Sequence, residues 1–456
     1  MTDRPGNPHL ALWIATAGPS HGEITRRIAT AAKVRGHRQI APDATRVRRW
    51  IDGEKPRPPV PTLLTAVLSE AVGQPLTPSD LGLTPAGPVL DDIQLPLLTE
   101  AAARTLSGWA RMDLFMNRRD TFKLTIGAPL ILAAERMLGG TARTMNGTRR
   151  GFDADAATAL EEVTAFFTAA DASKGGGLYR PAVVAQLAEV ARRIEDGVPP
   201  SLRTRVFMAA ADLAALAGWV SHDCGRYATA QRYWSYGVYA AGEAGQPQRG
   251  VEIVTRMSHQ MIYLGHPQDA LALLGVAAAK ADMPATRALV ASQTGRVHAA
   301  LGDEYLADTH LGNADELLAD GLGDHVPEWV TYFDAAEHEG ARAVSARDLA
   351  GLRRGGKAAS IHFEAALKLR RPGFDRVRLM DGVGLAAALL DEGEVERGAA
   401  AAQLALDSAA HVDSTLVTSR LNTLLDAARP YRTTAVDDVR TRAKDLVAAR
   451  STTIAA

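Results

Sequence analysis

Two groups of side chains in this 456-residue chain are suited to binding other molecules. The first lies near the N-terminus, where a threonine and three arginines stand close together as Thr45, Arg46, Arg48 and Arg49. Guanidinium groups pair with guanine edges and with phosphates, and threonine suits several bases. The first 60 residues hold 11 Lys and Arg against 5 Asp and Glu, although the whole chain has a formal charge of −1. This local excess of positive charge predicts that the N-terminal region meets a polyanion.

The second group is found by using a recurring glycine as a register mark. If Gly225, Gly265 and Gly302 each end a helix, the positions two, three and six residues earlier share one face of three successive helices. The polar and aromatic residues at those positions are Trp219, His222, Asp223, His259, Tyr263 and Arg296. Such a column suits a peptide, a carboxylate-bearing metabolite or the tail of a partner protein. The alternative is that these are ordinary packed residues on an alanine-rich helix.

The same glycines define a repeat. Together with Gly355 and Gly393 they lie 37 to 53 residues apart, and a small residue follows at a fixed offset, as at Ala230 and Ala270. This spacing predicts helical hairpins stacked into a solenoid and resembles the tetratricopeptide repeat (TPR), although an all-α domain with chance spacing would also fit. The 53-residue interval predicts one extended first helix from Glu328 to about Leu352, and 436–449 is expected to cap the array.

Four short helices are expected in the N-terminal region. In the third, Asp43 is placed to cap the free amides, and the inward stripe consists of Ala44, Val47, Trp50 and Ile51. Thr45, Arg46 and Arg49 then project outward, which is typical of the recognition helix of a helix-turn-helix.

The run from Val47 to Pro58 resembles the V-x-R-W-x-x-G-x-x-P segment of Xre/lambda-repressor-like regulators. The segment from Pro75 to Leu83 resembles the close of that domain in a bacterial group that fuses it to a TPR body. The resemblance implies a homodimeric transcription regulator that binds double-stranded DNA and senses a small molecule or peptide, as quorum-sensing regulators do. Thr45, Arg46 and Arg49 would contact base edges, and phosphates would be held by Arg26, Arg48, Lys55 and Arg57. The alternative is an interaction scaffold whose N-terminal domain does not bind DNA.

We therefore predict an all-α chain divided into a helix-turn-helix domain (1–84), a linker (85–96), a helical connector with degenerate repeats (97–200) and a TPR-like domain (201–456). The single cysteine, Cys224, and the lack of a signal sequence or long apolar run favour the cytoplasm and argue against membrane association. We expect no enzyme activity, cofactor or metal. The segment from Gly351 to Lys357 fits G-x-x-x-x-G-K but lacks the following Ser or Thr, and one cysteine cannot build a usual zinc site.

Overall fold

The described part of the chain is entirely helical. The computed structural model describes residues 6–34, 39–57, 59–72, 76, 78, 80–83, 93, 95–96, 99–115, 128–139, 152–323, 325–352, 358–409, 412 and 414–455. Within these ranges the chain forms twenty α-helices and two 3₁₀ turns without a strand, which confirms the predicted fold class. No helix among the described residues is both long and apolar enough to cross a bilayer.

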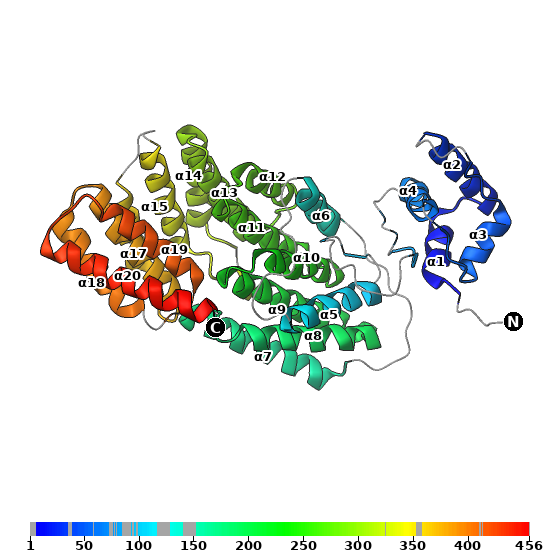
Figure 1. Ribbon diagram of the computed structural model, residues 1–456, viewed down its shortest axis with the longest axis horizontal. Helices are drawn as coiled ribbons and strands as arrows, with labels where there is room; N and C mark the ends of the chain where they lie inside the picture. Colours follow the sequence, from blue (N-terminus) through cyan, green and yellow to red (C-terminus); the bar gives the residue numbers. More distant parts are fainter. Residues whose placement is uncertain are drawn as a thin grey trace.

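The N-terminal head is a four-helix unit with its own core (Figure 1). Its helices are α1 (Pro8–Ala17), α2 (His21–Val34), α3 (Ala44–Ile51) and α4 (Val60–Val72). Trp13, Val47, Trp50 and Leu64 are buried in that core. The Asp43 carboxylate accepts a hydrogen bond of 2.8 Å from the Arg46 amide, so the predicted cap of α3 is confirmed. The first part of the turn between α2 and α3, residues 35–38, lies outside the described residues.

Four helices lead into the body. They are α5 (Thr99–Phe115), α6 (Ala128–Gly139), α7 (Ala154–Lys174) and α8 (Arg180–Asp196). The helix α5 packs on α8, and α6 packs on α10 (Tyr227–Glu243) and α12 (Pro267–Ala278). Both α7 and α8 pack on α9 (Arg203–Asp223). A single large core joins these elements to the first helical pairs, so the connector is continuous with the array. Most of the predicted linker at 85–96 lies outside the described residues.

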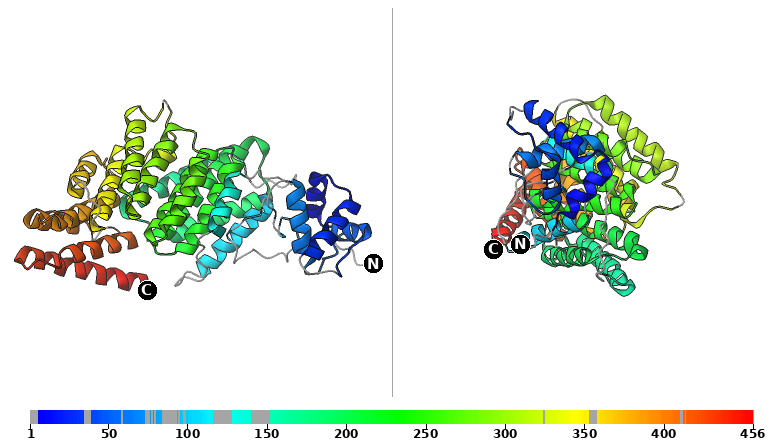
Figure 2. Two further views of the ribbon diagram at one scale, coloured as in Figure 1. Left: turned by 90° about the horizontal axis from the view of Figure 1, so that it is seen from above. Right: turned by 90° about the vertical axis from the view of Figure 1, so that its right-hand side faces the viewer.

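Six helical pairs complete the body. They stack side by side, as Figure 2 shows from green to red. In chain order they are α9 (Arg203–Asp223) with α10 (Tyr227–Glu243), α11 (Pro247–Tyr263) with α12 (Pro267–Ala278), α13 (Pro284–Ala300) with α14 (Glu304–Ala319), α15 (Ala335–Gly351) with α16 (Ala359–Leu369), α17 (Asp375–Asp391) with α18 (Val395–Ala409), and α19 (Thr415–Ala427) with α20 (Thr434–Ala455). The first helices of successive pairs pack on one another. We call α9, α11, α13, α15, α17 and α19 the inner helices.

The predicted extended helix is wrong. Helix α15 begins at Ala335 and has 17 residues, as α11, α13 and α17 do. The additional length lies before it, in a segment that includes the 3₁₀ turn Glu328–Val330. The aromatic cluster there packs beneath α13 instead of continuing a helix, because Val330 and Phe333 are buried against Ala285 and Leu289.

Glycine has two distinct uses in the array. Gly225, Gly265, Gly302 and Gly393 have φ angles between 75° and 85°, so the predicted left-handed turn is confirmed at these four positions, whereas Gly355 is outside the described residues. On the inner helices, a Cβ on Gly218 would lie 2.3 Å from the Trp234 ring, and one on Gly295 would lie 2.6 Å from Leu311. The two helices of these pairs therefore approach more closely than any side chain would allow.

The two ends of the array meet in what we call the closing contact. Arg376 on α17 forms ion pairs with Asp171 on α7 at 3.0 Å and with Asp223 on α9 at 3.3 Å. Ser414 donates to the Asp223 carboxylate, and Thr415 donates to the Asp223 carbonyl oxygen. Burial raises the pKa of Asp171 to about 6, although the Arg376 charge opposes this shift. The helix α17 and the start of α19 are thus tied to α7 and to the end of α9.

Candidate functional site

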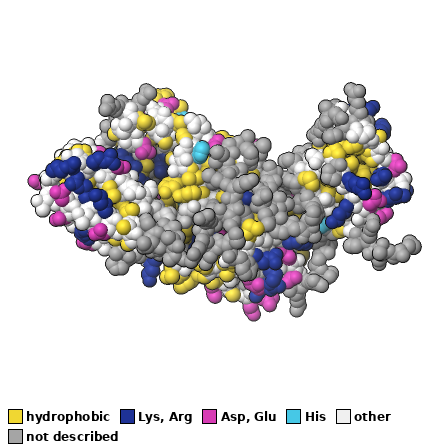
Figure 3. Space-filling model, viewed as in Figure 1, with side chains coloured by type: hydrophobic (Ala, Val, Ile, Leu, Met, Phe, Trp, Pro, Cys, Tyr) yellow, Lys and Arg dark blue, Asp and Glu magenta, His cyan; other side chains and the backbone are white. Residues whose placement is uncertain are grey.

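The outward face of α3 is basic and open to solvent. Thr45, Arg46, Arg48 and Arg49 are exposed, whereas Val47 and Trp50 on the opposite face are buried. An eight-residue helix with this division presents its cations to a partner without unpacking the core. Figure 1 places α3 on the side of the head that faces away from the body, and Figure 3 shows Lys and Arg side chains gathered there.

The three other predicted phosphate contacts flank this face and are also exposed. Lys55 and Arg57 follow the end of α3, and Arg26 lies on α2. Arg26 pairs with Glu23 at 2.5 Å, and Arg46 approaches Glu54 at 3.9 Å. Exposed pairs of this kind are weak, so both arginines could exchange a carboxylate for a phosphate at little cost.

The body brings together the second predicted group, from three different inner helices. Trp219 and His222 on α9 lie 5.9 Å and 6.0 Å, between ring centroids, from His259 on α11. The ring centroids of His222 and Tyr263 are 5.4 Å apart. Arg296 on α13 is hydrogen-bonded to His259. Asp223 lies beside this group but is occupied by the closing contact. We call Trp219, His222, His259, Tyr263 and Arg296 the inner-helix cluster.

His222 is the most unusual member of the cluster. Its side chain is 0% exposed, and neither ring nitrogen has a hydrogen-bond partner. Burial, reinforced by the Arg376 charge, lowers the pKa of His222 to about 3, so the ring is neutral at physiological pH. A neutral imidazole has one donor and one acceptor, and leaving both unused in an interior carries a desolvation cost.

The hydrogen bond between Arg296 and His259 fixes the chemistry of both groups. Arg296 Nη1 lies 3.1 Å from His259 Nδ1. Arginine only donates, so Nδ1 must accept and the proton of the neutral ring must sit on Nε2. Burial, together with the charge of Arg296, holds the pKa of His259 well below its ordinary value. His259 therefore has an N–H to offer to an acceptor.

Two further arginines form cation–π contacts with the ring of Trp219. The guanidinium carbons of Arg256 and Arg376 lie 5.5 Å and 5.2 Å from the centre of its ring, within cation–π range. Each of these arginines is neutralised, Arg256 by Glu252 at 2.5 Å and Arg376 by the closing contact. Tyr263, which is 36% exposed, is the cluster ring most open to a ligand.

Sequence reasoning missed two arginines beside the cluster, Arg347 on α15 and Arg420 on α19. Burial lowers the pKa of Arg420 to about 10, and the charges of Arg347 and Arg296 add to this shift. The register used for prediction relied on a glycine after each first helix, and neither α15 nor α19 is followed by a well-placed one. No sequence signal pointed to them.

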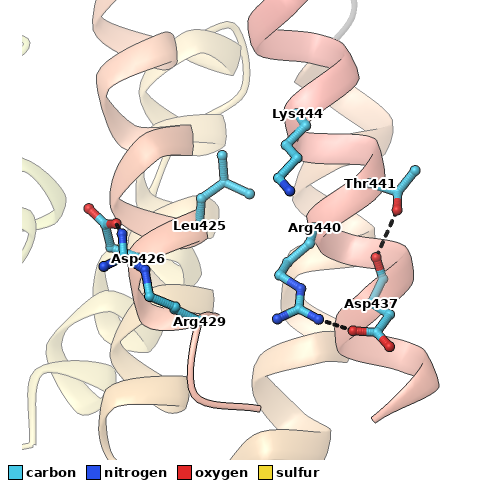
Figure 4. A pocket seen from close by; sticks show the side chains of 7 residues that line it. All are labelled: Leu425, Asp426, Arg429, Asp437, Arg440, Thr441 and Lys444. Atoms are coloured by element: carbon cyan, nitrogen blue, oxygen red, sulfur yellow. Dashed lines mark hydrogen bonds and ion pairs between the residues drawn. The ribbon is translucent and has the colours of Figure 1, made fainter. Parts of the chain in front are cut away.

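A separate pocket lies between α19 and α20 (Figure 4). Asp426, Arg429, Asp437, Arg440 and Lys444 supply its charged lining. Arg429 pairs with Asp426 at 2.5 Å, and Arg440 pairs with Asp437, each within one helical turn. Because these charges are satisfied locally and largely exposed, this pocket is a weaker candidate than the inner-helix cluster.

Comparison with known proteins finds a family match in the head. Residues 10–84 match a family described as the SP15 N-terminal domain. This match ends where the predicted helix-turn-helix domain ends, at residue 84, and leaves the connector and the array outside it. The family description does not mention a helix-turn-helix or the Xre group. No curated protein matches the chain significantly.

Proposed function

We propose that this protein is a sequence-specific DNA-binding transcription regulator whose helical body binds a small ligand and thereby controls DNA binding. The observation that carries the proposal is the surface of α3, where Thr45, Arg46 and Arg49 are exposed opposite a buried Val47 and Trp50. A helix of this kind inserts into the major groove and presents its arginines to guanine edges.

The remaining basic residues of the head would position it on the duplex. Arg48, Lys55, Arg57 and Arg26 flank α3 and would hold phosphates, which fix register without reading sequence. A two-fold operator would be read by a homodimer formed through the body, in the cytoplasm. A ligand bound in the body would change how the two heads of the dimer are arranged. It can do so only if it binds one state of the body more tightly than the other.

Gel retardation of the chain's own upstream DNA tests the proposal. At about 50 mM salt we expect binding, and four phosphate contacts predict roughly a hundredfold loss of affinity by about 200 mM. The double variant Arg46→Ala with Arg49→Ala should lose sequence preference, at a cost of about 1–3 kcal/mol for each base contact. The matched control removes two exposed body arginines, Arg205→Ala with Arg397→Ala, and should bind as the parent does.

The result also decides between the regulator and the scaffold. If the parent retards no DNA at low salt, or if the control variant weakens binding as much as the α3 variant, the α3 surface is not a reader. An interaction scaffold with a head that does not bind DNA would then be favoured.

A further inference from the structure

His222 is surrounded by aromatic and imidazole rings that solvent can reach. The ring centroids of Tyr263, Tyr227, Trp219 and His259 lie 5.4, 5.5, 5.7 and 6.0 Å from the centroid of the His222 ring. His222 itself is 0% exposed, whereas the other four residues are partly exposed. A molecule that approaches from solvent therefore meets these four rings before it reaches the buried imidazole.

Within the described residues, this group holds four buried polar atoms that have no hydrogen-bond partner. They are both ring nitrogens of His222, the side-chain oxygen Oε1 of Gln260 and the Nε atom of Arg296. Gln260 follows His259 on α11, and its amide nitrogen donates to the Tyr227 carbonyl oxygen at 3.1 Å. Arg296 joins the group through the 3.1 Å contact between its Nη1 and His259 Nδ1. Hydrogen bonds thus tie the side chains of Gln260 and Arg296 to residues whose rings surround His222.

Donors and acceptors are equally represented among these four atoms. A neutral imidazole supplies one of each, the Arg296 Nε is a donor, and the Gln260 oxygen is an acceptor. Each unused group costs free energy as long as it stays buried without a partner, and native interiors keep few of them. A guest molecule that both donates and accepts hydrogen bonds would remove this cost, whereas one that only accepts would leave half of it.

The arginines of this group are already opposed by negative charges. Arg256 and Arg376 are each paired with buried carboxylates, as described above. Burial lowers the pKa of Arg296, and the charges of Asp348 and Glu337 oppose that shift. A charged guest would therefore lose its hydration here without gaining a free counter-ion. The low pKa values of His222 and His259 have the same cause, because burial disfavours the charged form of each ring. These surroundings favour an uncharged guest.

We infer that the inner-helix cluster, with Tyr227 and Gln260, binds an uncharged aromatic carboxamide. The carboxamide oxygen would accept from the N–H groups of His222 or Arg296. Its nitrogen would donate to the other His222 nitrogen or to Gln260 Oε1. The aromatic ring of the ligand would lie against Tyr227 and Tyr263, which are open to solvent and suited to offset or edge-on packing. This inference rests on the ligand-binding half of the proposed function and names its ligand class.

Calorimetric titration of the full chain with benzamide, benzoate and benzamidine tests the inference. These probes are close in shape, and near neutral pH they are uncharged, anionic and cationic, respectively. We expect benzamide to bind with a dissociation constant of about 1 mM or below, and each charged probe to bind at least roughly tenfold more weakly. Tyr263→Leu should weaken benzamide binding roughly three- to tenfold. The matched control Tyr305→Leu, at an exposed tyrosine of α14, should bind benzamide as the parent does.

Two substitutions at His222 separate a binding role from a structural one. Leucine removes both ring nitrogens, so His222→Leu should weaken benzamide binding at least roughly tenfold, whereas His222→Gln keeps a donor and an acceptor and should retain part of it. His222→Leu should unfold at or above the temperature of the parent, because it removes two buried polar atoms without partners. Benzamide should raise the unfolding temperature of the parent and leave that of His222→Leu unchanged.

Three results would overturn the inference: no binding of benzamide up to about 10 mM, binding of benzoate or benzamidine as tight as that of benzamide, or unchanged benzamide binding in both His222→Leu and Tyr263→Leu. Gel retardation with the parent keeps this failure distinct from failure of the regulator. Benzamide binding by a chain that retards no DNA would leave the ligand site intact and remove the regulator. DNA binding without benzamide binding would do the reverse.

Discussion

His222 shows most clearly how burial controls a single residue in this protein. It is enclosed by aromatic and imidazole rings, has no hydrogen-bond partner, and is held neutral because burial lowers its pKa to about 3. In the unfolded chain the His222 ring takes up a proton near its ordinary pKa of 6.5, whereas in the folded chain it does not. The stability that depends on a neutral His222 is therefore fully present above pH 6.5 and is lost as the pH falls toward 3.

A substitution at His222 should reveal this pH dependence. Relative to the parent, His222→Gln should gain about 1.4 kcal/mol in the free energy of unfolding for each pH unit below about 6, because glutamine has no proton to exclude. Denaturant unfolding at several pH values between about 7.5 and 5 measures the difference. His325→Gln, at an exposed histidine, should follow the parent throughout. Parallel curves for His222→Gln and the parent would contradict the assignment of a neutral, buried ring.

At the scale of the helix, glycines on the inner helices set how closely each pair packs. Gly218 and Gly295 each lie seven residues before a turn glycine, and the next pair has Ser258 at the same place, fully buried. A small residue here lets the large side chain of the second helix, Trp234 or Leu311, lie directly on the backbone. This regularity is visible in the sequence once the turn glycine is used as a register mark.

Alanine substitutions at two glycines of one pair should separate this packing role from helix propensity. Gly295→Ala adds a Cβ 2.6 Å from Leu311 and should cost about 1–3 kcal/mol of stability through overpacking. Gly312→Ala on the partner helix α14 meets nothing within 4 Å and should be neutral or stabilising by up to about 1 kcal/mol. Chemical denaturation measures both, and equal effects would show that the two helices do not approach as described.

The closing contact acts at the scale of the whole molecule. Arg376→Gln should destabilise the fold by about 3–5 kcal/mol near pH 7.5, because it leaves Asp171 and Asp223 buried without their cation. Burial already raises the pKa of Asp171 to about 6, so protonation of Asp171 should relieve part of this loss at pH 5.5. The stability difference between variant and parent should thus shrink as the pH falls.

Unfolding at both pH values checks this, with Arg397→Gln as control. Arg397 pairs with Glu364 at the surface, so its loss should cost less than about 1 kcal/mol at either pH. A difference for Arg376→Gln that stays constant with pH would show that Asp171 is not the group left uncompensated.

Much of the fold and part of the site follow from sequence, for local reasons. Periodicity and capping residues place α1 to α4 and most array helices, and the turn glycines give the register that assembles Trp219, His222, His259, Tyr263 and Arg296. The ion pairs of Arg376 join segments more than 100 residues apart, and no local pattern encodes such closure. The misplaced start of α15 has a similar cause, because Val330 and Phe333 pack beneath α13 rather than continuing the helix.

The closing contact also has a consequence for synthesis on the ribosome. An open repeat array can acquire structure one unit at a time as it emerges. Here Asp171 and Asp223 are translated before their ion-pair partner Arg376, which follows them by 205 and 153 residues. Until that arginine leaves the exit tunnel, the nascent chain holds two acidic groups whose native burial is unfavourable. The early units are therefore expected to remain loosely assembled until most of the polypeptide has been translated.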